Sequence, residues 1–446
     1  IDGGPQTYYA IAPGLYVTCY WEFTIDVVQY CGNFWYGGES TDWADAENWV
    51  AKEVPAEGED IEFATVLNNK NKPAINNLLL DQDRVIGSLI NGSTKNLIIP
   101  TGKQLTIEGV VDDTNHTGGT IIIESDIDKP TGTLLFTENA SVNINKVDAT
   151  VQFYNKAYTC NDCGDIPRQE WQYFGIPVVG MDYPTGLNVN INKWDEKTFG
   201  DKWIELIPGN STLSAFTGYE INDTRDEQQE FIYQFAGKLN IGDAEIPLSY
   251  TESVNYKGWN LIGNSYTAAI PISTDAITYS GNWNSTVYLF NTGSRHSWRK
   301  LSGNTAWGLE SGRYKSVPLH VAGSGGLPSI IPSMHAFMIK ATSAGKMTLD
   351  YSKLTKNALV DGADNTPIAW RSSSSQPAKL PYIVMDVIGS QSADRVWLFE
   401  KMTATRGFDA GWDGEKMAES GLMQLYVAGS DDLKLQVATV PQLHDT

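Results

Sequence analysis

Trp259-Asn-Leu-Ile-Gly-Asn-Ser-Tyr266 decides the fold, because an earlier stretch, Trp171-Gln-Tyr-Phe-Gly-Ile-Pro-Val178, follows the same plan. Both begin with Trp, continue through large apolar residues and reach Gly at the fifth position. An internal repeat of this size indicates a β-module that is built twice, or the two halves of one β-sandwich.

The segments after each stretch repeat as well. Each stretch precedes an apolar strand, a strand that begins with Trp and an aromatic strand. We expect these strands at 187–191, 203–206 and 216–221 in the first copy and at 287–290, 298–301 and 335–339 in the second. The repeat assigns most of the Trp, Tyr and Gly in this region to the scaffold, so little of that composition is left to mark a catalytic site.

The composition predicts an all-β fold. The chain has 446 residues, and a prior of roughly 150 residues per domain gives about two to four domains. Thr, Val, Ile, Tyr, Trp, Asn and Gly dominate, which is typical of short strands and tight turns. Long segments of helical period are absent from the sequence.

The net charge limits the classes of partner. The formal charge is −21, from 53 acidic and 32 basic residues. This field repels nucleic acid and anionic lipid head groups, and it suits a protein that stays soluble outside the cell or one that collects cations. No run of 18 apolar residues occurs, so the sequence predicts no membrane-spanning helix.

Four cysteines, Cys19, Cys31, Cys160 and Cys163, give an even and sparse count. In an all-β chain this count predicts two disulfides in an oxidising compartment, with Cys19 and Cys31 joined across a hairpin. The pair Cys160-Asn-Asp-Cys163 is also compatible with free thiols or with half of a zinc site. A thioredoxin-like role needs a βαβ context, which the sequence lacks.

The chain divides into four predicted parts. Residues 1–34 form a β-hairpin (strands 15–23 and 24–31), the remnant or edge of a preceding β-domain. Residues 35–158 carry short strands a few residues apart with Gly, Asn, Pro or Thr between them, which is typical of a short β-solenoid (β-helix); an ordinary meander is the alternative. Trp43 and Trp49 plug the end of its core or, alternatively, form a sugar-stacking platform.

The other two parts follow the solenoid. Residues 159–358 form the duplicated β-sandwich region, and residues 359–446 form a C-terminal β-domain. We expect this last domain to be incomplete, because the strand-like run 433–440 stands very close to the end.

Aromatic residues in the repeated region are the candidates for ligand binding. Sugars pack their C–H faces on such rings, while neighbouring Asn and Asp satisfy the hydroxyl groups. The alternative for each ring is a place in the core. The candidates are Trp194, Trp283, Trp298, Trp307 and Tyr314.

Carboxylates give a weaker signal. Asp409, Asp413 and Glu415 gather on a Gly-rich loop that could hold calcium, although the EF-hand order is not met and a plain surface turn is the alternative. Glu220 and Asp223 are expected in a solvated hairpin. The five histidines are dispersed and no hydrolase, P-loop or dinucleotide motif occurs, so we predict no catalytic residue and no cofactor other than calcium.

The residues also carry a family resemblance. Trp259 to Ile270 resembles the G-W-N-L-I-G-N-P-Y segment of large secreted and cell-surface proteins of Bacteroidota, with Ser265 where that family usually has Pro. Trp35 to Pro55 is similar to the entry of their β-solenoid part, and the segments 216–221 and 395–413 resemble further elements. Such proteins are adhesin-like and are exported by the type IX secretion system.

The resemblance implies a non-enzymatic extracellular protein that acts in adhesion or as a structural stalk. It implies a location outside the cell or on the outer-membrane surface of a Gram-negative bacterium, with the secretion machinery as a partner during export. A glycan, or a surface protein of a host or neighbouring cell, is the expected ligand. The alternative is a carbohydrate-binding module or accessory part of a polysaccharide-degrading protein, and a lyase or hydrolase on the solenoid is the third reading.

Overall fold

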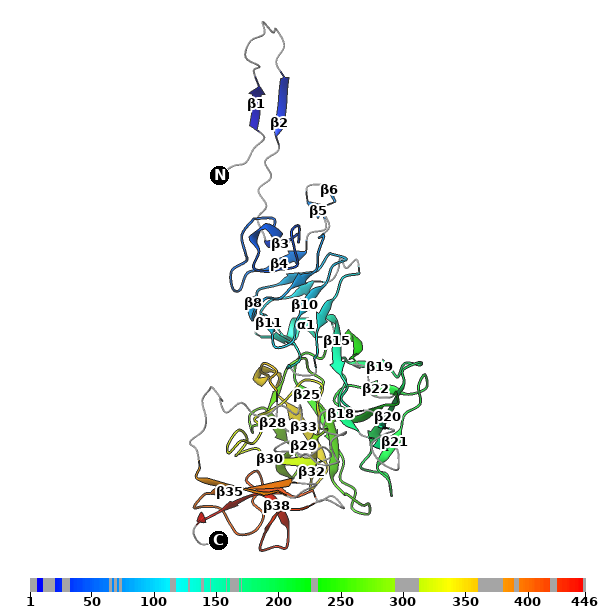
Figure 1. Cartoon of the computed structure of the whole chain (residues 1–446), viewed down its shortest axis with the longest axis vertical. Coiled ribbons are helices and arrows are strands. Elements are labelled where there is room, and N and C mark those ends of the chain that lie inside the picture. The colour runs from blue at the N-terminus through cyan, green and yellow to red at the C-terminus, as the bar shows by residue number, and fades with distance from the viewer. Residues whose placement is uncertain are drawn as a thin grey trace.

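The computed structural model is elongated and nearly all β, which confirms the prediction of an all-β chain (Figure 1). Among the described residues, helix is confined to α1 (Ala140–Asn143), η1 (Ala46–Asn48) and η2 (Tyr351–Lys353). The structure describes residues 6–10, 21–25, 33–63, 66–67, 70–71, 74–112, 118–126, 129–137, 140–144, 146–157, 159–160, 168–169, 171–225, 232–292, 313–359, 380–388, 393–417 and 423–443. No helix among these residues is long and apolar enough to cross a membrane.

An antiparallel hairpin stands apart at one end of the molecule (Figure 1). Its strands are β1 (Gln6–Ala10) and β2 (Trp21–Ile25), with Tyr8 opposite Phe23. The sequence predicted strands at 15–23 and 24–31, and that placement is wrong, because the first strand lies much closer to the N-terminus.

Three stacks of short parallel strands follow the hairpin. In one stack Leu78, Leu97, Ile121 and Ala149 lie in register, and all four are buried. Identical spacing of apolar residues on successive strands therefore builds a continuous core column. The stacks are β3 (Asn33–Trp35), β4 (Ile61–Phe63), β9 (Leu89–Ile90) and β12 (Val111–Asp112); β7 (Leu78–Leu79), β10 (Leu97–Ile99), β13 (Ile121–Ile123) and β15 (Asp148–Tyr154); and β8 (Arg84–Ile86), β11 (Gln104–Ile107) and β14 (Thr133–Phe136).

Residues 41–50 close the first end of these stacks. Trp35, Trp43 and Trp49 are buried there, and the Trp49 indole donates a hydrogen bond to the carbonyl oxygen of Trp43 at 2.9 Å. The same segment bridges to the outer strands, because Trp49 pairs with Trp35 and Asp42 pairs with Leu79. The interpretation of Trp43 and Trp49 as core residues is confirmed.

Two four-stranded antiparallel sheets carry the repeated stretches, and they share one strand order. When the four strands of each sheet are numbered along the chain, they lie side by side in the order first, fourth, second and third. The first sheet is β18 (Gln172–Phe174), β23 (Tyr219–Asp223), β20 (Val189–Trp194) and β21 (Trp203–Glu205). The second is β26 (Trp259–Gly263), β32 (Ala336–Ala341), β29 (Trp283–Asn291) and β30 (Arg313–Pro318).

One repeated strand differs from its predicted place. The partner of β29 is β30 at Arg313–Pro318, whereas the sequence predicted the segment 298–301, which lies outside the described residues. The other strand pairs in each copy are also antiparallel. In the first copy, β19 (Gly180–Asp182) pairs with β22 (Thr212–Ser214), and β15 pairs with β24 (Ile232–Lys238). In the second copy, β27 (Ile270–Pro271) pairs with β31 (Ile330–Ile331), and β33 (Gly345–Leu349) pairs with both β25 (Ala244–Leu248) and β28 (Ile277–Tyr279).

The C-terminal sheet lies at the opposite end from the hairpin (Figure 1). Its strands are β34 (Tyr382–Ile388), β35 (Ala393–Glu400), β38 (Lys434–Val440), β36 (Gly414–Glu415) and β37 (Val427–Ala428). Two small hairpins complete the described strands, β5 (Val66–Leu67) with β6 (Lys70–Asn71), and β16 (Thr159–Cys160) with β17 (Arg168–Gln169).

The two copies touch at the glycines of the repeated stretches. A Cβ atom added to Gly175 would lie 2.6 Å from the Cα atom of Gly263, and one added to Gly263 would lie 2.6 Å from the Cα atom of Gly175. Nearby, the amide of Gly218 donates to the carbonyl oxygen of Leu261 at 3.2 Å. Only glycine allows the two backbones to approach this closely.

We expect Gly175→Ala and Gly263→Ala each to lower the free energy of unfolding by about 1–3 kcal/mol, because the added methyl group meets backbone atoms that have no space to yield. Chemical denaturation of the purified variants measures the change. Gly180→Ala is the control, since its nearest contact would be an ordinary 3.5 Å and its stability should change by less than about 1 kcal/mol. Equal stability of all three variants would contradict the proposed close contact.

Candidate functional site: an aromatic row across the two repeats

Six aromatic rings form a continuous row from one repeat to the other, here called the aromatic row. Neighbouring ring centroids lie between 4.4 and 6.4 Å apart. In order along the row they are Tyr256, Trp194, Trp203, Tyr173, Phe290 and Tyr314. Five of the rings keep part of their surface exposed, and Tyr173 is buried.

The alternation of side chains along each strand places these rings on one face. In β20, Val189 and Ile191 point into the main core, so Trp194 belongs to the opposite face. Trp194 lies directly across from Trp203 on the neighbouring strand. The rings therefore gather on the opposite face of the strands. There Trp194, Trp203, Phe290 and Tyr314 pack against a second buried hydrophobic cluster, which consists of Tyr173, Trp259, Leu261, Tyr288, Ala336 and Met338.

The middle of the row holds the two repeats together. Tyr173 of the first repeat stacks on Phe290 of the second at 4.4 Å, and its hydroxyl shares a 2.6 Å hydrogen bond with the hydroxyl of Tyr314. The Trp194 indole donates to the carbonyl oxygen of Trp259 at 2.7 Å. These three contacts fix the relative positions of the rings before any ligand arrives.

A buried acid lies beside the row. Glu220 is opposite both Tyr173 and Asn192 in the sheet, only 5% of its surface is exposed, and the Asn192 amide donates to its carboxyl group at 2.8 Å. Burial raises the pKa of Glu220 to about 8, the Asn192 hydrogen bond lowers it, and the negative charge of Asp201 raises it further. At neutral pH this carboxyl group is therefore mostly neutral and can donate as well as accept a hydrogen bond.

The expectation that Glu220 and Asp223 lie in a solvated hairpin is wrong. Both belong to β23 and are buried. Asp223 accepts hydrogen bonds from the side chain of Arg225 and from the hydroxyl of Tyr233. The charged run after β23 concealed that the strand itself continues through both acids.

The outer part of the row is the part that a ligand can reach. Tyr256 is 65% exposed, whereas Trp194 and Trp203 are partly exposed. Ring faces of this kind pack on the C–H faces of sugars, while a partly exposed amide such as that of Asn192 binds hydroxyl groups. The arrangement can therefore bind, and its polar groups can orient, a flat polar ligand.

The structure brings two of the five predicted binding residues into this row, Trp194 and Tyr314. Trp283 packs elsewhere, against Tyr279 at 6.2 Å and the main core. Trp298 and Trp307 lie outside the described residues. The prediction missed the other four rings. The positions of Tyr173, Trp203 and Phe290 follow from the two-residue period of their strands, whereas Tyr256 lies in a turn.

The three carboxylates of the predicted calcium loop have separate partners. The buried carboxylate of Asp413 accepts hydrogen bonds from the amides of Asp409 and Thr439, and burial raises its pKa to about 7. Asp409 accepts from Thr405, and Glu415 forms an ion pair with Lys340 at 2.6 Å. No group of three His, Cys, Asp or Glu side chains in the described part of the chain could hold a metal ion. Calcium binding stays a prediction.

The predicted disulfides also stay predictions. Cys160 lies in β16, and Cys19, Cys31 and Cys163 lie outside the described residues.

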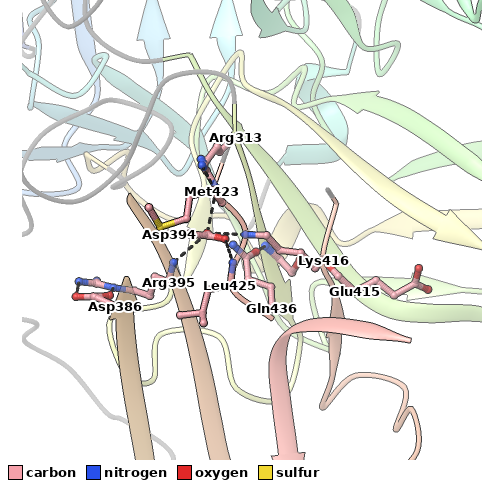
Figure 2. A network of polar contacts seen from close by, with 10 residues as sticks. Arg313, Asp386, Asp394, Arg395, Glu415, Lys416, Met423, Leu425 and Gln436 are labelled. Carbon is pink, nitrogen blue, oxygen red and sulfur yellow. Dashed lines mark hydrogen bonds and ion pairs between the residues drawn. The ribbon is translucent and has the colours of Figure 1, made fainter. Parts of the chain in front are cut away.

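A buried network of charges joins the second repeat to the C-terminal sheet (Figure 2). The carboxylate of Asp394 lies 2.5 Å from the ammonium of Lys416 and 3.3 Å from the guanidinium of Arg313. It also accepts a 2.6 Å hydrogen bond from the amide of Leu425, while Arg313 donates to the carbonyl oxygen of Met423. All three charged side chains are buried, so loss of one partner would leave an uncompensated charge inside the protein.

Comparisons with known proteins place the chain in a wider group. A family described as "Domain of unknown function (DUF8693)" matches residues 34–444. The minor fimbrium subunit Mfa5 of Porphyromonas gingivalis is 46% identical over 427 residues, which cover 93% of this chain. The chain spans 34% of the length of that relative. No solved structure is significantly similar to the chain.

We expect the stability of the protein to fall as the pH rises from about 5 to about 8, in part because of Glu220. In the unfolded chain the carboxyl group of Glu220 ionises near the ordinary glutamate pKa of 4.5, but in the folded protein it ionises only near pH 8. Between these two values the folded protein holds a proton that the unfolded chain has lost, so the free energy of unfolding falls as the pH rises. The Glu220→Gln variant has no group to ionise at this position. Its free energy of unfolding should therefore fall by at least about 1 kcal/mol less than that of the unmodified protein over the same pH range. Urea denaturation at several pH values measures both slopes, and parallel slopes would show that Glu220 titrates normally.

Proposed function

The chain belongs to the DUF8693 family, and from this premise we propose that it is a non-enzymatic part of an extracellular surface protein, acting in adhesion or as a structural stalk. The observation that carries the proposal is the 46% identity to a protein named as a subunit of a minor fimbrium. Its location is then the outer surface of a Gram-negative bacterium, or the space outside it. Its partners are other surface proteins, and its export uses the type IX secretion system.

The architecture that supports a stalk is a short β-solenoid followed by duplicated β-sandwich modules and a C-terminal β-domain. The parallel stacks favour the solenoid, because paired residues on neighbouring parallel strands are 19 or more positions apart, as Leu78 and Leu97 are, without a hairpin turn. The matched strand orders favour two related modules. We place the boundaries at residues 35–158, 159–358 and 359–446.

A stalk must transmit force without bending at its joints, and buried polar contacts cross the joint between the parallel stacks and the second repeat. The hydroxyl of Thr267 donates to the carbonyl oxygen of Leu134 at 2.7 Å, and the Tyr351 hydroxyl accepts from the amide of Phe136 at 3.3 Å. The backbone N–H of Asn357 donates to the hydroxyl of Thr133 at 2.9 Å. Satisfied buried hydrogen bonds fix a single geometry, because a changed angle would leave them unpaired.

Protease treatment of intact cells tests the location and the export route together. In the bacterium that encodes the chain, an antibody against residues 171–356 should lose its signal after treatment of whole cells, while a periplasmic control protein persists. In a strain without the type IX outer-membrane pore, the antigen should stay inside and be protected. Protection in the unmodified strain would overturn the surface proposal, and surface display without the pore would overturn only the export route.

Carbohydrate binding is a second candidate function, and the aromatic row is the observation that favours it. Tyr256, which is exposed, and Trp203, which is partly exposed, both contact the ring of Trp194, and the partly exposed Asn192 lies two residues before Trp194 on the same strand. The strong negative charge of the protein disfavours anionic sugars, so a neutral glycan is the expected ligand.

We expect the purified chain to bind neutral glycans on an array, and Trp203→Ala to weaken this binding at least about tenfold, which corresponds to about 1.4 kcal/mol. Trp283→Ala is the matched control, because Trp283 is also a partly exposed tryptophan but lies outside the aromatic row. The same array with added calcium tests the loop of Asp409, Asp413 and Glu415. An array without hits in both conditions, or equal losses in both tryptophan variants, would rule out the row as a sugar site.

A further inference from the structure

A buried carboxylate reaches from the first repeat to the second beside the aromatic row. Glu196 lies in the turn between β20 and β21, and only 3% of its surface is exposed. Its oxygens accept hydrogen bonds at 2.8 Å from the backbone amides of Thr251 and Gly258 and from the hydroxyl of Thr251. These donors belong to the segment that leads into β26 of the second repeat. A charge that is costly to bury therefore holds this segment against the first repeat.

The turn that carries Glu196 is itself fixed by hydrogen bonds. The ammonium group of Lys202, which is also buried, donates to the carbonyl oxygen of Glu196 at 2.7 Å and to the carbonyl oxygen of Thr198. The backbone amide of Asp195 donates to the carbonyl oxygen of Lys202 at 2.9 Å, which closes the turn. The carboxylate of Glu196 therefore has a rigid support, and it can set the position of residues 251–258.

Tyr256 lies between the two residues that Glu196 holds. Its φ of 52° is in the left-handed region, which is unfavourable for a residue with a Cβ atom and persists only where the surrounding structure imposes it. The ring of Tyr256 contacts the ring of Trp194, with 6.4 Å between the centroids and 67° between the planes. Because Tyr256 is 65% exposed, packing in a core contributes little to its position. The bonds from both ends of its turn to Glu196 set where the ring stands.

We propose that Glu196 is a positioning residue of the aromatic row and acts on a bound glycan through Tyr256. This inference rests on the carbohydrate-binding function proposed above. Glu196 does not touch the ligand, because its carboxylate is buried and its oxygens bind the second repeat. It holds the ring of Tyr256 at a steep angle to Trp194, so that a sugar stacked on one ring meets the other at its side. A ring that is fixed in advance loses less conformational freedom when the ligand binds.

A double-mutant cycle on the whole chain is the first arm of the test, with the neutral glycan that gives the strongest array signal as the probe. Tyr256→Ala and Glu196→Ala should each weaken binding at least about fivefold. The double variant should bind no more weakly than Tyr256→Ala alone, because Glu196 acts only through that ring. Glu196→Gln should retain binding, since its amide oxygen still accepts from both backbone amides. Glu245→Ala is the control, because it removes an exposed acid of the second repeat and should leave binding unchanged.

A fluorine label is the second arm and needs no ligand. With trifluoromethyl-phenylalanine in place of Tyr256, the fluorine NMR signal should shift and broaden in Glu196→Ala and return to its original position in Glu196→Gln. An unchanged signal in Glu196→Ala, or additive losses in the cycle, would overturn the inference and leave glycan binding by the unmodified chain intact. Absence of glycan binding by the unmodified chain would instead overturn the proposed function, and the role of Glu196 in binding with it, even where the label shows that Glu196 holds the turn.

Discussion

The pairing of β15 on both of its edges is the constraint on which the rest of the structure depends. On one edge Val151 lies opposite Ile123 in a parallel ladder, and on the other it lies opposite Phe235 in an antiparallel ladder. The last strand of a parallel stack is therefore also the first strand of the first repeat. Because side chains alternate along a strand, the register of β15 sets which residues of both parts face a common core.

Sequence patterns could predict the nearly all-β fold and the internal repeat, because both depend on local alternation and on the Trp-to-Gly stretches. The third strand of the second sheet could not be found this way. In β30, Arg313 and Lys315 occupy buried positions that an apolar pattern does not reveal. The partners that satisfy such charges, Asp394 among them, lie far away in the sequence, so only the folded structure brings them together.

The candidate site was predictable to a similar degree. Trp194 and Tyr314 stood out as aromatic residues near loops, but Tyr173 looked like part of the scaffold because it belongs to the repeated stretch. Glu220 seemed to belong to a charged turn, since the acids that follow it in sequence dominate the local composition. Its burial depends on neighbouring strands that are paired with it in space, and no local pattern contains that information.

The closed end of the parallel stacks has a consequence for how copies of the protein behave in solution. A stack of parallel strands with a bare terminal coil is a template on which another chain can continue the ladder, as in fibril growth. Residues 41–50 occupy that position, with Trp49 paired to Trp35 and Asp42 paired to Leu79, and three indoles fill the core behind them. The stacks therefore end in a coil whose backbone is paired and whose core is filled, so a second copy cannot continue the parallel ladder at this end.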